Sequence, residues 1–222
     1  MTSSIETDFK KEFLRKGIHL MSISIPIFYS FNEKPFTLSI LVTLFFFSLL
    51  VDICRLYFEN FKFFFHKLFN SILREHEITS HKKNLTGATY ILLSSIICIL
   101  VFPKHIAITS LSILIISDSL SAIVGRKFGH HHFKNLSEGK KTWEGSIAFV
   151  LSAFAVVIFT PKISNLFMEY IIMLFSSIGG AFAEVISFNF LDDNLAIPIT
   201  IGILMWIMYL FFLPNLVLAN DF

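Results

Sequence analysis

Long apolar stretches recur along almost the whole chain, and they limit the folds that it can adopt. We identify seven, at residues 17–31, 36–51, 87–102, 105–124, 146–160, 167–188 and 195–213, and the first is short and interrupted by Pro26. A helix needs roughly 20 apolar residues to cross a bilayer, and shorter spans are accommodated by tilt or local thinning. With 55% hydrophobic and only 15% charged residues, the composition argues against a soluble domain. Residues 1–222 are therefore predicted to form one all-α domain, a polytopic membrane bundle of about seven transmembrane helices.

The basic residues are distributed unevenly between the apolar stretches. All but three of the 18 lysines and arginines precede the first stretch or lie between the second and third or the fourth and fifth; the exceptions are Lys34, Lys104 and Lys162. The positive-inside rule then predicts a cytoplasmic N-terminus and an outer C-terminus. Residues 52–83 are too charged to cross, and their Phe-rich part, residues 57–69, predicts an amphipathic helix lying at the membrane surface.

An acidic residue, Asp118, lies inside the fourth apolar stretch near its predicted cytoplasmic end. Ionisable residues in apolar segments are costly and usually functional. Gly125 and Gly129 follow at i+7 and i+11, close to the same helical face, and Ser119 and Ser121 keep that region slim enough for a ligand or a neighbouring helix. Simple capping, or pairing with a nearby lysine, is the alternative, but it does not explain the glycines. We predict that Asp118 belongs to a functional site.

The loop at residues 125–145 ends in a cluster, Gly139-Lys-Lys-Thr-Trp-Glu-Gly-Ser146, that opens the fifth apolar stretch. Its two lysines supply ammonium donors, Thr142 suits the cap of the following helix, and the free N–H groups of a helix N-terminus favour phosphate. The order of residues differs from a Walker A loop. An ordinary basic loop with a normal helix cap is the alternative. Because Asp118 is close by, we favour a loop that binds nucleotide phosphates.

The loop before the last apolar stretch is the one inward-facing loop that is rich in acid and free of Lys and Arg. Phosphoryl transfer needs Mg²⁺ to bridge phosphate oxygens, and one or two carboxylates commonly hold that ion. We therefore predict a metal site formed by Asp118, Asp193 and Asn194. Helix capping is the alternative, and it accounts for one of the polar residues in this loop but not for all of them.

Two further sets of polar residues lie within or beside apolar stretches. Arg15 and His19 are four residues apart and share a helical face, with Lys16 between them. For the two basic residues, the alternative to a functional role is membrane topology. For His19 the favoured interpretation is a core or interface histidine with a satisfied hydrogen bond. Glu184 is isolated in the sixth stretch, where an ionisable group is rarely neutral background. We expect Glu184 to pair with Arg15, Lys16 or His19, or to bind the hydroxyl of a lipid.

Five ordered blocks of sequence carry a family resemblance over most of the chain. They are Arg15-Lys16-x-x-His19, Leu85-Thr-Gly-Ala-Thr-Tyr90, Asp118-x-x-Ser-Ala-x-x-Gly125-Arg-Lys-x-Gly129, Gly139-Lys-Lys-Thr-x-Glu144-Gly145-Ser146 and Asp193-Asn194-Leu-x-Ile-Pro198. With these blocks the chain resembles the polyprenol kinase family, which includes dolichol kinase, phytol kinase and CTP-dependent diacylglycerol kinase. The resemblance implies an all-helical membrane kinase that uses CTP, or less often another nucleoside triphosphate, with Mg²⁺.

The resemblance also implies roles for individual residues. Catalytic roles fall to Asp118, Lys141, Arg15 and Lys16. The nucleotide would be held by Gly125, Arg126, Gly129, Lys140, Lys141, Thr142, Glu144, Gly145 and Ser146. The expected partners are a nucleotide and a membrane lipid alcohol such as a polyprenol, a phytol-like alcohol or diacylglycerol, with no nucleic acid. The active site is expected on the cytoplasmic side of a multi-pass membrane protein.

Two other functions compete with this interpretation. The related CTP:phosphatidate cytidylyltransferases share a Lys-Lys-Thr-x-Glu-Gly block, but they also carry a C-terminal His-Gly-Gly run and Asp-Arg-x-x-Asp, both of which this sequence lacks. A transporter or scaffold could use the same polar residues as an anion gate or as a packing contact. The grouping of the acidic, Gly and Lys-Lys-Thr blocks on one predicted side of the membrane argues against that second alternative.

Overall fold

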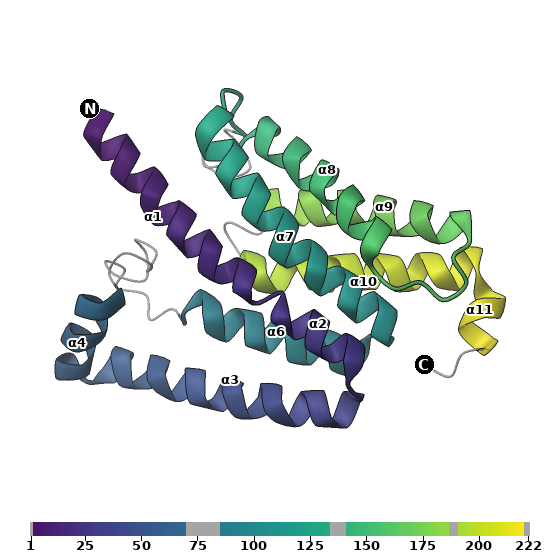
Figure 1. Ribbon diagram of the computed structural model, residues 1–222, viewed down its shortest axis with the longest axis horizontal. Helices are drawn as coiled ribbons and strands as arrows, with labels where there is room; N and C mark the ends of the chain where they lie inside the picture. Colours follow the sequence, from purple (N-terminus) through teal and green to yellow (C-terminus); the bar gives the residue numbers. More distant parts are fainter. Residues whose placement is uncertain (1, 70–84, 134–140, 187–190, 220–222) are drawn as a thin grey trace.

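The computed structural model describes residues 2–69, 85–133, 141–186 and 191–219, and its regular elements there are all α-helices (Figure 1). The predicted all-α class is therefore confirmed. Residues 70–83 of the predicted surface segment and residues 134–140 of the 125–145 loop, including Lys140, lie outside the described residues. The helices are α1 (Thr2–Met21), α2 (Ser24–Phe31), α3 (Lys34–Tyr57), α4 (Glu59–Phe69), α6 (Gly87–Val101), α7 (Lys104–Phe128), α8 (Trp143–Phe159), α9 (Phe167–Ile186), α10 (Asp193–Phe212) and α11 (Pro214–Ala219).

Four of these helices, α3, α7, α9 and α10, are long and apolar enough to cross a membrane. They correspond to the second, fourth, sixth and seventh predicted spans. The third and fifth predicted spans form α6 and α8, which are apolar but only 15 and 17 residues long. The protein is thus a membrane protein built on four candidate spans, whereas seven crossings and the orientation of the N-terminus stay predictions.

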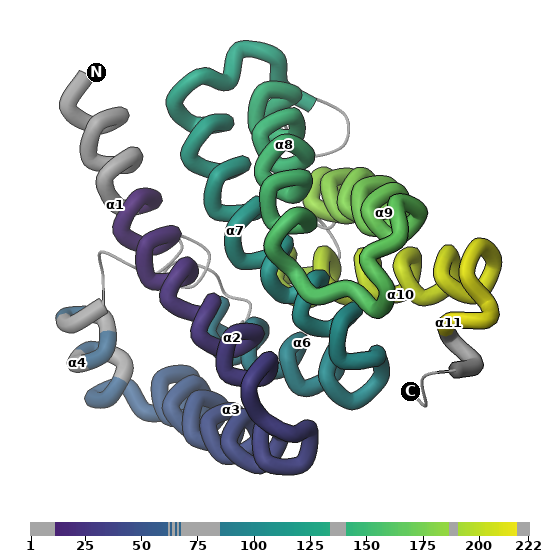
Figure 2. The backbone as a smooth tube through the Cα atoms, turned by 45° about the vertical axis from the view of Figure 1, so that its right-hand side comes forward, coloured from purple at the N-terminus to yellow at the C-terminus, as the bar shows by residue number. Residues whose placement is uncertain are grey.

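The first predicted span is interrupted near Pro26, as expected, and the chain breaks there between α1 and α2. Pro26 has no N–H to donate to the carbonyl of Ser22, and its ring would clash with that carbonyl in a continuous helix. The backbone instead makes tight turns, in which Ser22 N–H donates to the His19 carbonyl at 3.0 Å and Ile25 N–H donates to the Ser22 carbonyl at 2.9 Å. The break divides this part of the chain into two consecutive helices, α1 and α2 (Figure 2).

The helix that the others surround is α7, which packs on α1, α2, α6, α8, α9 and α10. Its central position is visible in both views (Figures 1 and 2). In α7, 78% of an 18-residue apolar stretch is buried. The corresponding share in α3 is 17%, so α3 presents most of its surface outward. Since α7 carries Asp118, this predicted site residue lies in the interior of the bundle rather than on its surface.

Glycines allow the C-terminal helices to approach closely. A Cβ atom added at Gly180 of α9 would lie 2.6 Å from Ile201 of α10. One added at Gly202 of α10 would lie 2.3 Å from the buried ring of Phe102. By contrast, nothing lies within 4 Å of a Cβ added at Gly17 of α1. The bundle is therefore closely packed around Gly180 and Gly202 and open around Gly17.

These two environments predict opposite effects of the same substitution. Gly202→Ala should destabilise the bundle by about 1–3 kcal/mol, because it overpacks the contact with Phe102. Gly17→Ala should be neutral or stabilise by up to about 1 kcal/mol, because alanine is the better helix former. Unfolding of the purified protein in mixed detergent, followed by circular dichroism, measures both. Equal effects of the two substitutions would contradict the packing described here.

Candidate functional site

Asp118 on α7 is the centre of one group of charged side chains. It is 2% exposed, and its Oδ2 accepts a hydrogen bond from the Nζ atom of Lys16 on α1. The Nε2 atom of His19, one turn further along α1, lies 3.7 Å from the same oxygen. Three residues from two predicted blocks, about 100 positions apart in the chain, therefore meet inside the bundle. A buried carboxylate is tolerated here because a cation is paired with it.

Lys141 is the centre of a second group, to which three helices contribute. Its Nζ atom donates to Glu184 Oε1 of α9 at 2.9 Å and to Asp193 Oδ2 of α10 at 3.0 Å. Ser121 of α7 donates to the same Glu184 oxygen at 2.7 Å. Burial by itself would lower the pKa of Lys141, but the carboxylates of Asp193 and Glu184 raise it well above its usual range. Lys141 therefore carries a positive charge throughout the physiological pH range.

Two hydrogen-bond partners of Glu184 were not foreseen. We expected a pair with Arg15, Lys16 or His19, or a bond to the hydroxyl of a lipid, and in the structure its Oε1 atom binds Lys141 and Ser121. The reason is geometric, since α9 packs against α8 and α10 and so presents Glu184 to the start of α8.

The start of α8 is held against the end of α7 by small residues. Thr142 is the N-cap of α8, as predicted, and its hydroxyl oxygen accepts a hydrogen bond from the N–H of Gly145 at 3.2 Å. A Cβ added at Gly125 would lie 2.9 Å from that hydroxyl oxygen, and one added at Gly145 would lie 3.1 Å from the Ser121 carbonyl. The predicted glycines thus have a structural reason, because they let the α8 N-terminus lie directly beside the α7 segment that follows Asp118.

Four other predicted residues lie around the edge of these groups. Arg15 donates to Glu12, and Arg126 Nη2 lies 3.2 Å from the other oxygen of Glu12, so both arginines pair with an acid that the sequence analysis had not singled out. Glu144 accepts from the backbone N–H of His131 at 3.2 Å and lies 2.7 Å from its ring Nδ1. Ser146 donates its backbone N–H to the Thr142 carbonyl inside α8.

Gly129, another of the predicted nucleotide-binding residues, is the C-cap of α7. Its N–H donates to the Gly125 carbonyl at 3.0 Å, and an added Cβ would lie 2.6 Å from Thr142. Beyond it, backbone hydrogen bonds join the two described ends of the loop: Trp143 N–H donates to the His131 carbonyl at 2.9 Å, and Phe133 N–H donates to the Lys141 carbonyl at 3.0 Å. These bonds fix Lys141 immediately before α8.

The N-terminus of α10 brings Asn194 into the interior. Asp192 caps this helix by accepting the N–H of Asn194 at 3.0 Å. The Asn194 side chain is 2% exposed, and its Oδ1 has no hydrogen-bond partner among the described residues. Its backbone carbonyl also lacks the usual helical donor, since Pro198 has no N–H. Two acceptors of one residue are therefore available beside Asp193 for a cation or a hydroxyl group.

Each predicted metal-binding carboxylate lies beside a lysine, and Asp118 also acts on Lys141, the partner of Asp193. Within the described ranges, no group of three or more His, Cys, Asp or Glu side chains could hold a metal ion. Asp118 pairs with Lys16, while Asp193 and Asn194 lie together on α10. Mg²⁺ in phosphoryl-transfer sites is usually held by one or two carboxylates and the phosphates themselves, and the side-chain oxygens of Asp118, Asp193 and Asn194 are ligands of that kind.

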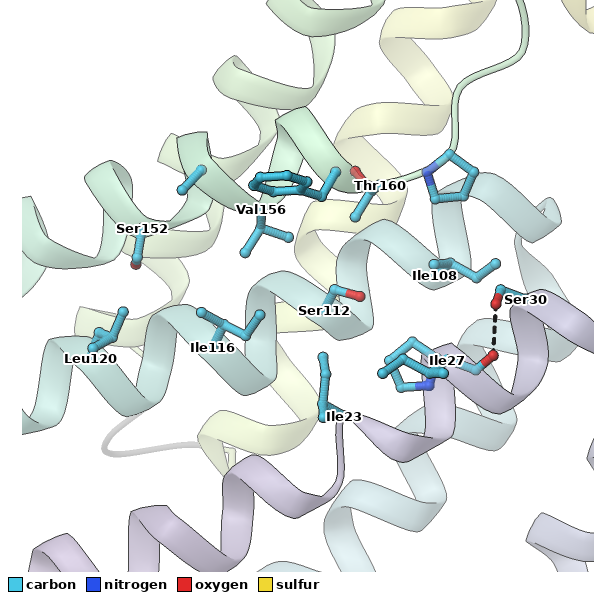
Figure 3. Close-up of a pocket in the computed structure, with 14 residues that line it drawn as sticks. Ile23, Ile27, Ser30, Ile108, Ser112, Ile116, Leu120, Ser152, Val156 and Thr160 are labelled. Carbon is cyan, nitrogen blue, oxygen red and sulfur yellow. Dashed lines mark hydrogen bonds between the residues drawn. The ribbon is translucent and has the colours of Figure 1, made fainter.

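A pocket with a volume of about 490 Å³ lies between α2, α7 and α8 (Figure 3). It follows a row of residues spaced by four on α7, from Ile108 to Leu120. Ser30 and Thr160 lie toward one end, and Leu120 and Ser152 toward the other (Figure 3). Most of its lining is apolar, so it suits a hydrocarbon group rather than a nucleotide.

Sequence reasoning missed two buried acids with several partners, Asp52 and Glu169, which are 1% and 0% exposed. Glu169 accepts the backbone N–H groups of Ile163, Ser164 and Leu166 and the hydroxyl of Tyr209. The signal for Asp52 was available, because an acid at the end of an apolar stretch with an arginine three residues later can form a pair within one helix. Because residue 52 was assigned to the charged segment at the membrane surface, its pairing with Arg55 was not predicted.

Removal of the Lys141 charge should be costly. Lys141→Met leaves two carboxylates without their cation and should destabilise the protein by about 3 kcal/mol. Adding Glu184→Gln should restore part of that loss, because a neutral amide needs no counter-charge. The matched control is Lys127→Met, which removes an exposed lysine and should change stability by less than about 0.5 kcal/mol. Thermal unfolding in detergent measures all three variants, and an equal loss for both lysines would refute the buried ion group.

Comparison with known proteins finds relatives of similar sequence, some of which are named as lipid kinases. An uncharacterised protein of Rickettsia prowazekii is 31% identical over 194 residues, which cover 87% of this chain and 92% of that protein. A CTP-dependent diacylglycerol kinase of Schizosaccharomyces pombe is 28% identical, over 71% of this chain and 74% of the yeast protein. A probable phytol kinase of Zea mays is 27% identical, over 95% of this chain and 70% of the maize protein. No protein-family model matches the chain, and neither does any solved structure.

Proposed function

The chain belongs to the polyprenol kinase family, and from this premise we propose that it transfers the terminal phosphoryl group of CTP, or of another nucleoside triphosphate, to the hydroxyl of a membrane lipid alcohol. The products would be the lipid phosphate and the nucleoside diphosphate. Diacylglycerol and phytol, after which these relatives are named, both carry a hydroxyl on a hydrophobic body. The proposed substrate is therefore a lipid alcohol.

The observation that carries the proposal is the convergence of charged groups from five elements at one end of the bundle. Lys16 comes from α1, Asp118 from α7, Lys141 from the loop before α8, Glu184 from α9 and Asp193 from α10. A structural bundle has little reason to bury so many ionisable groups in an apolar fold, since each costs free energy unless it is paired. The arrangement supports a site for a multiply charged ligand.

We assign the phosphate-binding role to Lys141 and the N-terminus of α8, with Lys140 as a further donor. Free N–H groups at the first turn of a helix favour anions, and an ammonium held by two carboxylates is ready to contact phosphate oxygens. Asp193 and Asn194 would hold Mg²⁺ together with those phosphates. When bound, the ion would supply positive charge that offsets the negative charge of the phosphates.

In the proposed reaction the lipid hydroxyl oxygen forms a bond to the terminal phosphorus. The bond from that phosphorus to the bridging oxygen breaks, the hydroxyl proton passes to water, and the nucleoside diphosphate departs with the electron pair of the broken bond. Negative charge grows on the bridging oxygen during transfer, and cations aimed at that oxygen stabilise the transition state. We assign this task to Lys141 and Lys16, with Asp118 holding Lys16 in place from the interior of the bundle.

The hydrophobic body of the lipid would occupy the pocket between α2, α7 and α8. Its walls are apolar, and the pocket runs along the same helix that carries Asp118, ending at Leu120, two residues away in sequence. Asp118 faces α1, where it contacts Lys16, so the chain would lie on one side of α7 and the hydroxyl end would turn toward α1. Pockets of this size hold most of the surface of a small apolar ligand.

The site would face the cytoplasm, where nucleotides are available. The support is the bias of Lys and Arg toward alternate loops, which predicts that the starts of α6, α8 and α10 lie on the inner side. We retain seven crossings and a single domain over residues 1–222 as part of this proposal. Two apolar helices of 15 and 17 residues can still cross with local thinning of the bilayer.

The proposal predicts that Asp118→Asn abolishes most activity while the protein stays folded. Transfer of label from γ-labelled CTP into extracted lipid should fall by at least about 100-fold, because the Lys16 ammonium loses its anchoring charge. The control is Glu33→Gln, which removes an exposed carboxylate and should leave transfer unchanged. Size-exclusion chromatography monitors the fold of both variants. Full activity in folded Asp118→Asn would contradict the assignment.

The chain pocket gives a separate prediction. Leu120→Trp should raise the KM for phytol about tenfold by narrowing the pocket, while the KM for CTP stays the same. A ten-carbon alcohol, which fills less of the pocket, should be affected less. Leu100→Trp is the matched control, because Leu100 is an exposed leucine of α6 outside the pocket. The same KM change in both variants would place the hydrocarbon chain elsewhere.

A further inference from the structure

Two charged residues are buried at the cytoplasmic end proposed for α3, a helix that is otherwise largely exposed. Asp52 is 1% exposed and Arg55 is 2% exposed, and their side chains lie 3.4 Å apart. The functional site described above uses neither of them. Burying a carboxylate on a helix with so little interior surface is costly, which calls for a specific reason.

The contacts of Asp52 supply one. Its Oδ2 atom accepts three hydrogen bonds from the start of α6: from Thr86 N–H at 2.8 Å, from Thr86 Oγ1 at 3.0 Å and from Thr89 Oγ1 at 2.7 Å. Thr86 is the N-cap residue of α6, but its own side chain makes no capping bond. A carboxylate of a neighbouring helix therefore binds the N-cap residue and a first-turn hydroxyl of α6, and its negative charge lies at the positive end of that helix.

The α6 segment that Asp52 holds lies against the proposed metal and phosphate residues. Gly87, the first residue of α6, is so close to α10 that an added Cβ would lie 3.3 Å from Asn194 Nδ2. Asn194 is buried, its Oδ1 has no hydrogen-bond partner among the described residues, and its neighbour Asp193 binds Lys141. The position of the Asn194 amide thus depends on where α6 begins.

We infer that Asp52 is a positioning residue of the phosphoryl-transfer site: from α3 it fixes the N-terminus of α6, and through Gly87 it sets the orientation of Asn194. The inference rests on the proposed function. It assigns to α3 a part in the reaction, although α3 supplies no residue to the groups around Asp118 and Lys141. A purely structural cap would stabilise α6 to the same extent but would not change the contribution of Asn194 to phosphoryl transfer.

Glu169 provides a matched control for this distinction. It is also a buried carboxylate that accepts backbone N–H groups at the start of a helix, in this case α9. It accepts the hydroxyl of Tyr209, near the C-terminal end of α10, whereas Asn194 lies at the N-terminal end of that helix. Loss of either carboxylate should lower stability to a similar degree, and only loss of Asp52 should act through Asn194.

The test is a double-mutant cycle on phosphoryl transfer by the full-length protein in detergent with Mg²⁺ and CTP. Asp52→Asn should lower kcat about tenfold with little change in the KM for lipid, and combining it with Asn194→Ala should cost no more than Asn194→Ala alone. Glu169→Gln should lower the thermal midpoint, leave kcat near wild type and combine additively with Asn194→Ala. If Asp52→Asn does not fold, Thr89→Val takes its place, since it removes one donor to the carboxylate and keeps the charge.

The outcomes separate the two claims. Independent, additive effects of Asp52 and Asn194 on kcat in an active enzyme would overturn the positioning role and leave the kinase assignment intact. Equal losses of kcat in the Asp52 and Glu169 variants would also overturn it, because a general loss of stability would then explain both. Absence of transfer by the wild-type protein with every lipid alcohol would instead refute the proposed function itself.

Discussion

The pairing of buried charges is the constraint on which the rest of this structure depends. Lys141 is neutralised by Glu184 and Asp193, and Asp118 by Lys16, and each of these groups comes from a different element. Removing one member leaves a charge in an apolar interior, which costs several kcal/mol. The ion pairs therefore hold α1, the start of α8, α9 and α10 in register around α7, and they keep cations at the place where a phosphate chain would bind.

Close backbone approach at the same end completes this arrangement. Gly125 and Gly145 allow α7 and α8 to meet, and Gly87 lets the start of α6 lie beside Asn194. The helices α6, α8 and α10 thus all begin near the ion pairs, with the partial positive charge of their N-termini directed to one region. An anion placed there would interact with three helix ends in addition to the lysines, which is a physical reason for a nucleotide site in a bundle without a phosphate-binding loop of the Walker type.

Much of the fold and the site could be predicted from the sequence, because the signals were local. The length of the apolar stretches located the helices. Asp118 and Glu184 stood out as ionisable residues inside such stretches, and Lys141, the cap at Thr142 and Asp193 were marked by the loops that precede them. What failed depended on tertiary packing: the partners of Glu184 follow from how α9 faces α8. The division of α1 from α2 was indicated by Pro26, yet hydropathy alone read it as one interrupted span. Asp52 was hidden because its importance depends on the start of α6, whose contacts with Asp52 are 34 and 37 residues away in the chain.

The origin of the phosphorus in the lipid product is the measurement that tests the central claim most directly. Purified protein would be incubated with CTP labelled at the α position or at the γ position, with Mg²⁺ and lipid alcohol or phosphatidate. The account predicts that γ-label, and not α-label, enters the lipid, and that the acceptor is the alcohol. Entry of α-label into a lipid made from phosphatidate, with release of pyrophosphate, would contradict it and assign the same site to nucleotidyl transfer.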